Sequence, residues 1–188
     1  MATKIIGGKF RSMSLATPKG KTARPTLGRI RENLFNIISE QVVGVDFLDL
    51  FAGLGAVGLE ALSRGARRCV FVENAAPCLA AINQNIARLK VEEQCEVMRT
   101  SCFRALELLA RRGESFDCLF ADPPYQRGLA QRLLDALKNT GLWRENSLII
   151  LQTERQDDLL LAAAGALVLE RKVDYGATSL WLYRPAHE

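Results

Sequence analysis

Residues 46–58 read DFLDLFAGLGAVG, and this stretch decides the fold. The apolar run at 46–51 is typical of a buried strand, the three glycines predict a tight turn, and residues 59–62 continue as a helix. Glycine lets a ligand approach the backbone, and the start of a helix offers unpaired N–H groups. The stretch therefore indicates a nucleotide site, although a glycine motif alone is weak evidence.

A second predicted strand, at 69–72, ends in Glu73, twenty residues after Gly53. A carboxylate at this place accepts hydrogen bonds from the two ribose hydroxyls, so the pair of motifs predicts an adenosine-containing ligand. Two ligands remain open at this point, a nicotinamide dinucleotide and S-adenosylmethionine. The dinucleotide needs donors for its pyrophosphate, whereas the ammonium and sulfonium of S-adenosylmethionine favour carboxylates such as Asp49.

The sequence Asp122-Pro123-Pro124-Tyr125 follows an apolar run at 118–121, which predicts a loop at the carboxyl end of a strand. Proline has no N–H and restricts the residue before it to extended geometry, so the loop offers carbonyl acceptors, a carboxylate and an aromatic face. This combination suits a flat group that donates hydrogen bonds, such as the exocyclic amine of a nucleobase. The alternative is an ordinary turn, since Asp, Pro and Tyr are common loop residues.

With these motifs the chain resembles the class I, Rossmann-like S-adenosylmethionine-dependent methyltransferases, whose amino-methylating members carry [Asn/Asp]-Pro-Pro-[aromatic]. The segments IIGGKFR at 5–11, RPT at 24–26 and RIRENLFN at 29–36 further resemble N-terminal signatures of the bacterial RsmD family. That family methylates the N2 amine of a guanine in small-subunit (16S) ribosomal RNA. The resemblance extends from Ile5 through the last predicted strand.

The resemblance implies S-adenosylmethionine as the cofactor and assigns roles to individual residues. The expected cofactor-binding residues are Asp49, Phe51, Gly53, Gly55, Glu73, Asn74, Ser101 and Cys102. The expected catalytic residues are Asp122 and Pro123, which accept the N–H groups of the amine, and Tyr125, which stacks on the base. Many methyltransferases have an acidic residue near the adenine amine after the third strand, but residues 100–103 read TSCF, so Ser101 or a backbone carbonyl is expected there instead.

The N-terminal segment is strongly basic. Residues 1–36 contain eight Lys and Arg against the single acid Glu32, a net charge of +7, so the chain's net +4 leaves −3 for the remainder. Such a segment attracts phosphates, and the alternative is a solvated surface that only aids solubility. The residues expected to contact RNA are Lys9, Arg11, Arg24, Arg29 and Arg31.

Composition narrows the chemistry further. The only histidine is His187, which argues against catalytic triads and histidine-ligated metals, and no metal site is expected. Five cysteines without C-x-x-C spacing are typical of reduced core residues in a cytoplasmic protein. The longest apolar run, 159–169, is about half a membrane span, and residues 1–4 lead into no secretory segment. We expect a monomer that does not bind membranes and acts on 16S rRNA within a small-subunit particle.

The fold expected from these patterns is α/β, with a seven-stranded mixed sheet. Strands near 47–51, 69–73, 96–99, 116–121 and 147–153 alternate with helices near 56–64, 75–89, 102–112 and 127–138, and a hairpin at 167–183 closes the sheet. A small hairpin and a helix at 26–41 form an N-terminal extension, residues 1–40, beside a methyltransferase domain, residues 41–188. The functional alternatives are an amino-methyltransferase acting on adenine, cytosine or a protein glutamine, and a non-catalytic RNA-binding module.

Overall fold

The computed structural model describes residues 3–18, 25–125, 128–157 and 166–186. The predicted alternation of strands and helices is confirmed, although β5 begins at Trp143, ahead of the predicted start at 147. The elements are α1 Pro25–Ile38, a 3-10 turn Ser39–Val42, β1 Asp46–Asp49, α2 Ala56–Ser63, β2 Arg68–Glu73, α3 Ala76–Leu89, a 3-10 turn Glu92–Gln94, β3 Cys95–Arg99, α4 Cys102–Arg111, β4 Phe116–Ala121, α5 Leu129–Lys138, β5 Trp143–Glu154, β6 Leu167–Tyr175 and β7 Thr178–Pro185.

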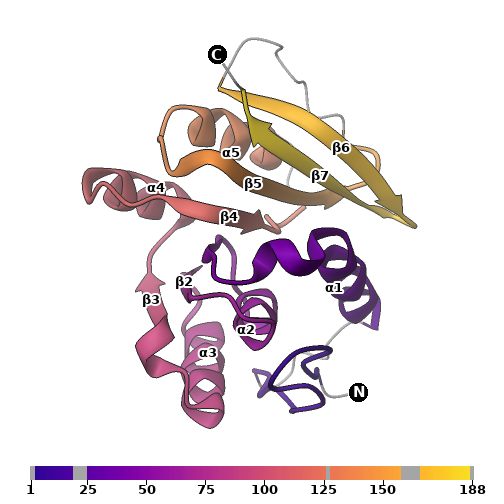
Figure 1. Ribbon diagram of the computed structural model, residues 1–188, viewed down its shortest axis with the longest axis vertical. Helices are drawn as coiled ribbons and strands as arrows, with labels where there is room; N and C mark the ends of the chain where they lie inside the picture. Colours follow the sequence, from indigo (N-terminus) through magenta and orange to yellow (C-terminus); the bar gives the residue numbers. More distant parts are fainter. Residues whose placement is uncertain (1–2, 19–24, 126–127, 158–165, 187–188) are drawn as a thin grey trace.

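The seven strands form one mixed sheet in the order β3-β2-β1-β4-β5-β7-β6 (Figure 1). Strands β1 to β5 pair in parallel, and β7 pairs antiparallel with both of its neighbours, as predicted. From β1 the chain proceeds to β2 and β3 on one side and returns through β4 and β5 on the other. The strand order therefore reverses between β1 and β4, and ligands of open α/β sheets bind outside the carboxyl ends of strands at such a reversal.

Alternate residues of the strands pack into two separate apolar clusters, one on each face of the sheet. Phe47 belongs to a cluster with residues of α1, α2 and α3, whereas Leu48 belongs to a cluster with residues of α4 and α5. In Figure 1 these two groups of helices lie on opposite sides of the sheet. The period-two burial of the strands is thus what holds helices on both faces.

The N-terminal segment doubles back on itself and packs beside α1. Backbone hydrogen bonds join Ile5 to Met13 and Leu15 to Thr3, but the segment has only one antiparallel bridge, between residues 4 and 14. The predicted hairpin is therefore present as a short antiparallel pairing among residues 3–18, and the positive φ of residues 8 and 12 limits its length. Ile5 and Leu15 share the apolar cluster of α1, so this cluster spans the predicted domain boundary at residue 40.

The cysteines are free thiols, and four of the five are buried. Burial raises the pKa of both Cys95 and Cys118 to about 12, which keeps these thiols protonated and unreactive at neutral pH. In the part of the chain that the structure describes, no helix is long and apolar enough to cross a membrane, and no cluster of three His, Cys, Asp or Glu residues is placed to hold a metal.

Gly58 lets α2 approach the sheet closely. A Cβ atom at this position would lie 2.4 Å from Cε1 of Phe71 and 2.5 Å from Sγ of Cys69, both fully buried. We expect Gly58→Ala to lower the free energy of unfolding by up to about 2 kcal/mol, because overpacking costs about 1–3 kcal/mol and the gain in helix propensity returns only about 1 kcal/mol. Urea denaturation of purified protein measures this change.

Gly28 supplies a matched control. It lies inside α1, and a Cβ atom there would meet no atom within 4 Å. Gly28→Ala should therefore raise the free energy of unfolding by up to about 1 kcal/mol. A Gly58→Ala protein as stable as the unaltered chain would contradict the packing argument.

Candidate active site

The loop after β1 forms the floor of the candidate site. Gly53 has φ 58°, and a Cβ atom there would face open space, so its backbone is accessible to a ligand. Gly55, with φ 80°, begins α2 and lies under the loop, where a Cβ atom would be 3.3 Å from Leu59. Phe51 has φ 148°, a value rare for a residue with a side chain, and such strain is common at functional sites.

The carboxylate of Glu73, at the end of β2, holds this loop in place. Its Oε2 accepts the Gly53 N–H at 2.9 Å, and its Oε1 accepts the N–H groups of Asn74 and Ala75 at 2.8 and 2.9 Å. A carboxylate oxygen accepts about two hydrogen bonds, so Oε2 retains one acceptor position. Glu73 is therefore both a structural brace for the loop and an acceptor available to a ligand hydroxyl.

Asp49 is buried at the end of β1, and only one of its two carboxylate oxygens accepts a hydrogen bond. Its Oδ2 accepts the Gly58 N–H at 3.0 Å, whereas its Oδ1 has no hydrogen-bond partner. Burial raises the pKa of Asp49 to about 7; the Gly58 N–H opposes this rise, and the carboxylates of Asp122 and Glu73 add to it. A buried acceptor among other acids favours a cationic ligand.

The Asp122-Pro123-Pro124-Tyr125 loop follows β4 directly. Asp122 is half-buried, and burial raises its pKa to about 7, with the nearby Gln152 amide offsetting part of the rise. Pro123 is buried, and no described residue donates a hydrogen bond to its carbonyl. Tyr125 is 47% exposed, so its ring is available to stack on a ligand.

Two pockets meet at this edge of the sheet and share Phe51, Gly53 and Asp122 on their walls. The larger, of about 520 Å³, extends toward Glu73 and the start of α4. The smaller, of about 170 Å³, extends toward Asp49 and α1. Together they form a two-part cleft at the reversal of strand order, where the sequence predicts the ligand.

Most of the predicted cofactor residues lie on this cleft. The larger pocket is lined by Phe51, Gly53, Glu73, Asn74, Ser101 and Cys102, and Asp49 lines the smaller one. Gly55 lines neither, because it lies behind the loop. Ser101 also caps α4, since its Oγ accepts the Arg104 N–H at 3.4 Å.

The predicted RNA-contacting residues do not share one environment. Lys9, Arg11 and Arg29 are exposed, and Arg24 lies outside the described residues. Arg31 is only 5% exposed and lines the smaller pocket, so it does not share the exposed surface of Lys9, Arg11 and Arg29. Its guanidinium lies against Glu60 of α2 and the Lys4 carbonyl.

Two residues that sequence reasoning missed complete the cleft and its support. Gln152, near the end of β5, lines the smaller pocket, and its Nε2 has no hydrogen-bond partner. Its position at the end of the apolar run 147–151 was a usable signal. Glu60 of α2 is completely buried and receives the N–H groups of Ile6 and Gly7 at 2.8 and 2.7 Å. A lone acid in an apolar helix was its only signal.

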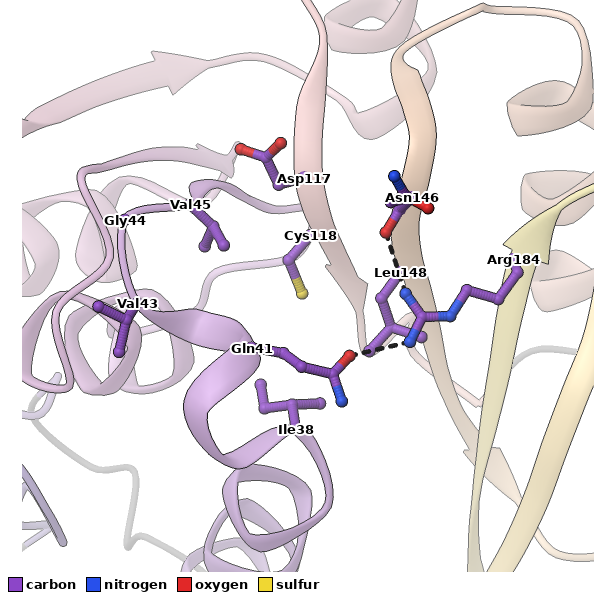
Figure 2. Close-up of a pocket in the computed structure, with 10 residues that line it drawn as sticks. All are labelled: Ile38, Gln41, Val43, Gly44, Val45, Asp117, Cys118, Asn146, Leu148 and Arg184. Carbon is purple, nitrogen blue, oxygen red and sulfur yellow. Dashed lines mark hydrogen bonds between the residues drawn. The ribbon is translucent and has the colours of Figure 1, made fainter.

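A separate hollow of about 470 Å³ lies at the opposite edge of the sheet, where β1, β4 and β5 begin (Figure 2). Its main cation, Arg184, donates to the Asn146 carbonyl at 3.0 Å and to Gln41 Oε1 at 2.8 Å. Asp117 accepts the Asp46 N–H at 2.7 Å and pairs with an arginine of β5. The charged groups of this hollow are thus already bonded within the protein.

The functional groups of the cleft are mainly hydrogen-bond acceptors. The described residues on its walls include no histidine, and burial raises the pKa of the Cys102 thiol, so no nucleophile and base are paired there. Asp122 and the Pro123 carbonyl can accept hydrogen bonds from an amine. The cleft can therefore position an amine and stabilise positive charge on it.

Comparisons with known proteins agree with this arrangement. The family model Conserved hypothetical protein 95 matches residues 3–184. The chain is 34% identical to ribosomal RNA small subunit methyltransferase D of Escherichia coli (strain K12), with 90% of this chain and 84% of that protein covered. It is 32% identical to the protein of the same name from Haemophilus influenzae, with 96% and 93% covered. The solved structure of yhhF from Escherichia coli has 33% identity and a TM-score of 0.86, and 98% of both chains is covered. The chain therefore has the class I methyltransferase fold and belongs to the RsmD family.

Proposed function

We propose that this protein transfers a methyl group from S-adenosylmethionine to the exocyclic N2 amine of a guanine in 16S ribosomal RNA. The observation that carries the proposal is the half-buried Asp122, which lines both pockets and precedes Pro123, whose carbonyl receives no hydrogen bond from a described residue. The names of the relatives support ribosomal RNA of the small subunit as the substrate. The choice of the guanine N2 amine rests on the resemblance to the RsmD family.

The cleft fits S-adenosylmethionine, which supplies an electrophilic methyl group on a sulfonium. The unpartnered Asp49 Oδ1 would accept from its ammonium, and Glu73 Oε2 from a ribose hydroxyl. Ser101 and Cys102, at the start of α4, would border the adenine. A buried acidic acceptor suits this cation better than it suits the pyrophosphate of a dinucleotide.

The guanine amine is a poor nucleophile because its lone pair is delocalised into the ring. Asp122 and the Pro123 carbonyl would each accept one N–H, which favours tetrahedral geometry at nitrogen and stabilises the positive charge that develops there. The exposed Tyr125 would stack on the base after the base leaves its helix.

RNA affinity is assigned to the N-terminal extension, residues 1–40, and methyl transfer to residues 41–188. Lys9, Arg11 and Arg29 are exposed cations within the extension, where phosphates can reach them. We propose that the protein acts as a cytoplasmic monomer on a small-subunit particle, without a metal or a membrane.

Replacing Asp122 tests the mechanism. Asp122→Ala should lower kcat roughly 10²–10³-fold, because a preorganised acceptor of the developing charge is lost, while S-adenosylmethionine affinity changes far less. Asp122→Asn should be milder, since its amide oxygen still accepts a hydrogen bond. Single-turnover kinetics at saturating cofactor separate the two variants, and near-normal turnover of Asp122→Ala would refute this role.

The pH dependence provides a control on the same residue. The pKa of Asp122 is raised to about 7, so the carboxylate is lost as the pH falls through 7, and kcat should fall with it. Asp122→Asn cannot titrate and should lack this part of the profile.

The product identifies the base. Small-subunit particles and naked 16S rRNA from a strain without this protein should be incubated with the enzyme and digested to nucleosides. We expect N2-methylguanosine, and none with the Asp122→Ala protein. Detection of N6-methyladenosine or a methylcytosine would show that the enzyme methylates another base and not guanine. Methylated protein glutamine would show that the acceptor is a protein and not RNA. RNA binding without methyl transfer would favour a non-catalytic RNA-binding module.

Neutralising the exposed cations tests the RNA surface. A variant with Lys9, Arg11 and Arg29 all changed to Gln should flatten the slope of log affinity against log salt by about 2, at about 0.7 for each phosphate contact with single-stranded RNA. Cofactor affinity should not change. Filter binding at salt concentrations from about 50 to about 300 mM measures the salt slope of RNA affinity.

A control with the same change in charge has Arg88, Arg111 and Arg171 changed to Gln, all exposed and outside the N-terminal extension. This variant should keep the salt slope of the unaltered protein. If both triple variants show the same salt slope of RNA affinity, the N-terminal charge serves solubility only and does not bind RNA.

A further inference from the structure

Gln152 and Asp122 lie side by side at the carboxyl ends of two neighbouring strands. The parallel register of β4 and β5 pairs Ala121 with Leu151, so the next residue of each strand continues the same row. Neighbouring strands lie about 4.8 Å apart, a separation that side chains of this length can bridge. The two side chains are therefore within reach of a direct hydrogen bond.

Both side chains also lie on the same face of the sheet. Phe120 of β4 and Ile150 of β5 pack in the apolar cluster of α1, and the residue after each of them packs in the cluster of α4 and α5. Because successive strand residues alternate between the two faces, Asp122 and Gln152 return to the α1 side. Both of them line the smaller pocket, which agrees with this placement.

The side-chain amide of Gln152 is buried and has a donor to spare. Gln152 is 4% exposed, and its Nε2 forms no hydrogen bond with a described residue. An amide nitrogen carries two N–H donors, and a buried donor without a partner lowers stability. The four preceding residues, 148–151, are all leucine or isoleucine, so an apolar residue at position 152 would extend the core without this cost. Packing therefore does not account for a glutamine at this position.

The neighbouring acid benefits from such a donor. Burial raises the pKa of Asp122 to about 7, and the Gln152 amide opposes this rise. The amide is thus near enough to act on the carboxylate, although it does not form a complete hydrogen bond in this structure. Hydrogen bonds between catalytic groups are often long in the free enzyme and tighten when the substrate binds.

We infer that Gln152 is a positioning residue, which donates from Nε2 to one carboxylate oxygen of Asp122 and so aims the other oxygen at the substrate amine. This inference rests on the proposed function, which makes Asp122 the acceptor of that amine. A hydrogen bond to an ionised acceptor is stronger than one to a neutral acceptor, so Gln152 keeps Asp122 charged as well as oriented.

The pH profile of single-turnover methyl transfer, at saturating cofactor and RNA, tests this role. Gln152→Met has a side chain of similar length without a donor. Without the donor the ionised form of Asp122 is less stable, so Asp122 takes up its proton at a higher pH. The acidic limb of the profile should move to higher pH by about one unit, the effect of losing a hydrogen bond to a charged group. Gln152→Glu replaces the donor by a like charge and should move the limb further in the same direction.

The other ionisable groups near Asp122 are unchanged in these variants, so the difference between the profiles reports on Gln152. Two of them line the smaller pocket, and two line the larger one. They are Arg31 of α1 and Asp49 of β1 in the smaller pocket, and Glu73 of β2 and the Cys102 thiol of α4 in the larger pocket.

A double variant shows whether Gln152 acts through Asp122. In the Asp122→Ala protein no carboxylate remains to be positioned, so adding Gln152→Met should leave the residual rate unchanged. Cofactor affinity, measured by calorimetry, should be similar with and without Gln152→Met. A loss of rate by the same factor in both backgrounds would overturn the inference, because Gln152 would then act independently of Asp122.

Gln94→Met is the matched control. Gln94 is exposed, lies just before β3 at the opposite edge of the sheet, and also donates from its amide, to the Arg67 carbonyl at 3.2 Å. This variant should keep the pH profile of the unaltered protein. A partly unfolded variant loses rate by the same factor at every pH, so the position of the acidic limb does not depend on the folded fraction.

The inference is overturned if the acidic limb of Gln152→Met coincides with that of the unaltered protein. The proposed function stands in that case, because the unaltered protein still forms N2-methylguanosine. If the unaltered protein transfers no methyl group to guanine, the proposed function fails, and the inference fails with it.

Discussion

The buried carboxylate of Glu60 joins parts of the chain that are far apart in sequence. It accepts the N–H groups of Ile6 and Gly7 in the N-terminal segment, pairs with Arg64 after α2, and lies 3.5 Å from Arg31 of α1. Removing one partner from a buried ion pair typically costs about 3–5 kcal/mol, because the remaining charge is left without compensation. The position of the N-terminal segment on the domain, and that of Arg31 in the cleft, therefore depend on this one side chain.

The register of the sheet brings the acids of the cleft together. Asp49 lies opposite Phe71 of β2 and Phe120 of β4, and Glu73 and Asp122 each follow two residues after those partners. Because the three strands are parallel and adjacent, their carboxyl ends meet at one edge. The resulting repulsion is visible in Asp49, whose pKa is raised by both neighbours in addition to burial. A bound cation would relieve that repulsion, so the clustered carboxylates favour a positively charged ligand.

Much of this arrangement was predictable from local sequence, because strands, glycine turns and the Asp122 loop follow from neighbouring residues. The burial of Arg31 was also readable, since successive helix residues differ by 100° and Arg31 falls within the apolar arc of Ile30, Leu34 and Phe35, whereas Arg29 lies opposite. Its partner Glu60 was not predictable, because that contact joins residues far apart in the chain. The N-terminal hairpin pairs only briefly, and its position on the domain comes from contacts with α2 and α3 that join residues far apart in the chain.

Volume alone does not identify the active cleft. The hollow at the opposite edge holds about 470 Å³ against about 170 Å³ for the smaller pocket, yet each of the three guanidinium nitrogens of its Arg184 already donates to a group of the protein. The smaller pocket is instead lined by Arg31 and Asp49, whose Nε and Oδ1 have no hydrogen-bond partner, on different elements and almost completely buried. Folding alone favours pairing such groups, and buried polar atoms without partners reduce stability. These unpaired atoms cluster at the reversal of strand order, and a ligand that completes their hydrogen bonds best explains the cluster. Destabilising features of this kind are more common at functional sites than elsewhere in a protein.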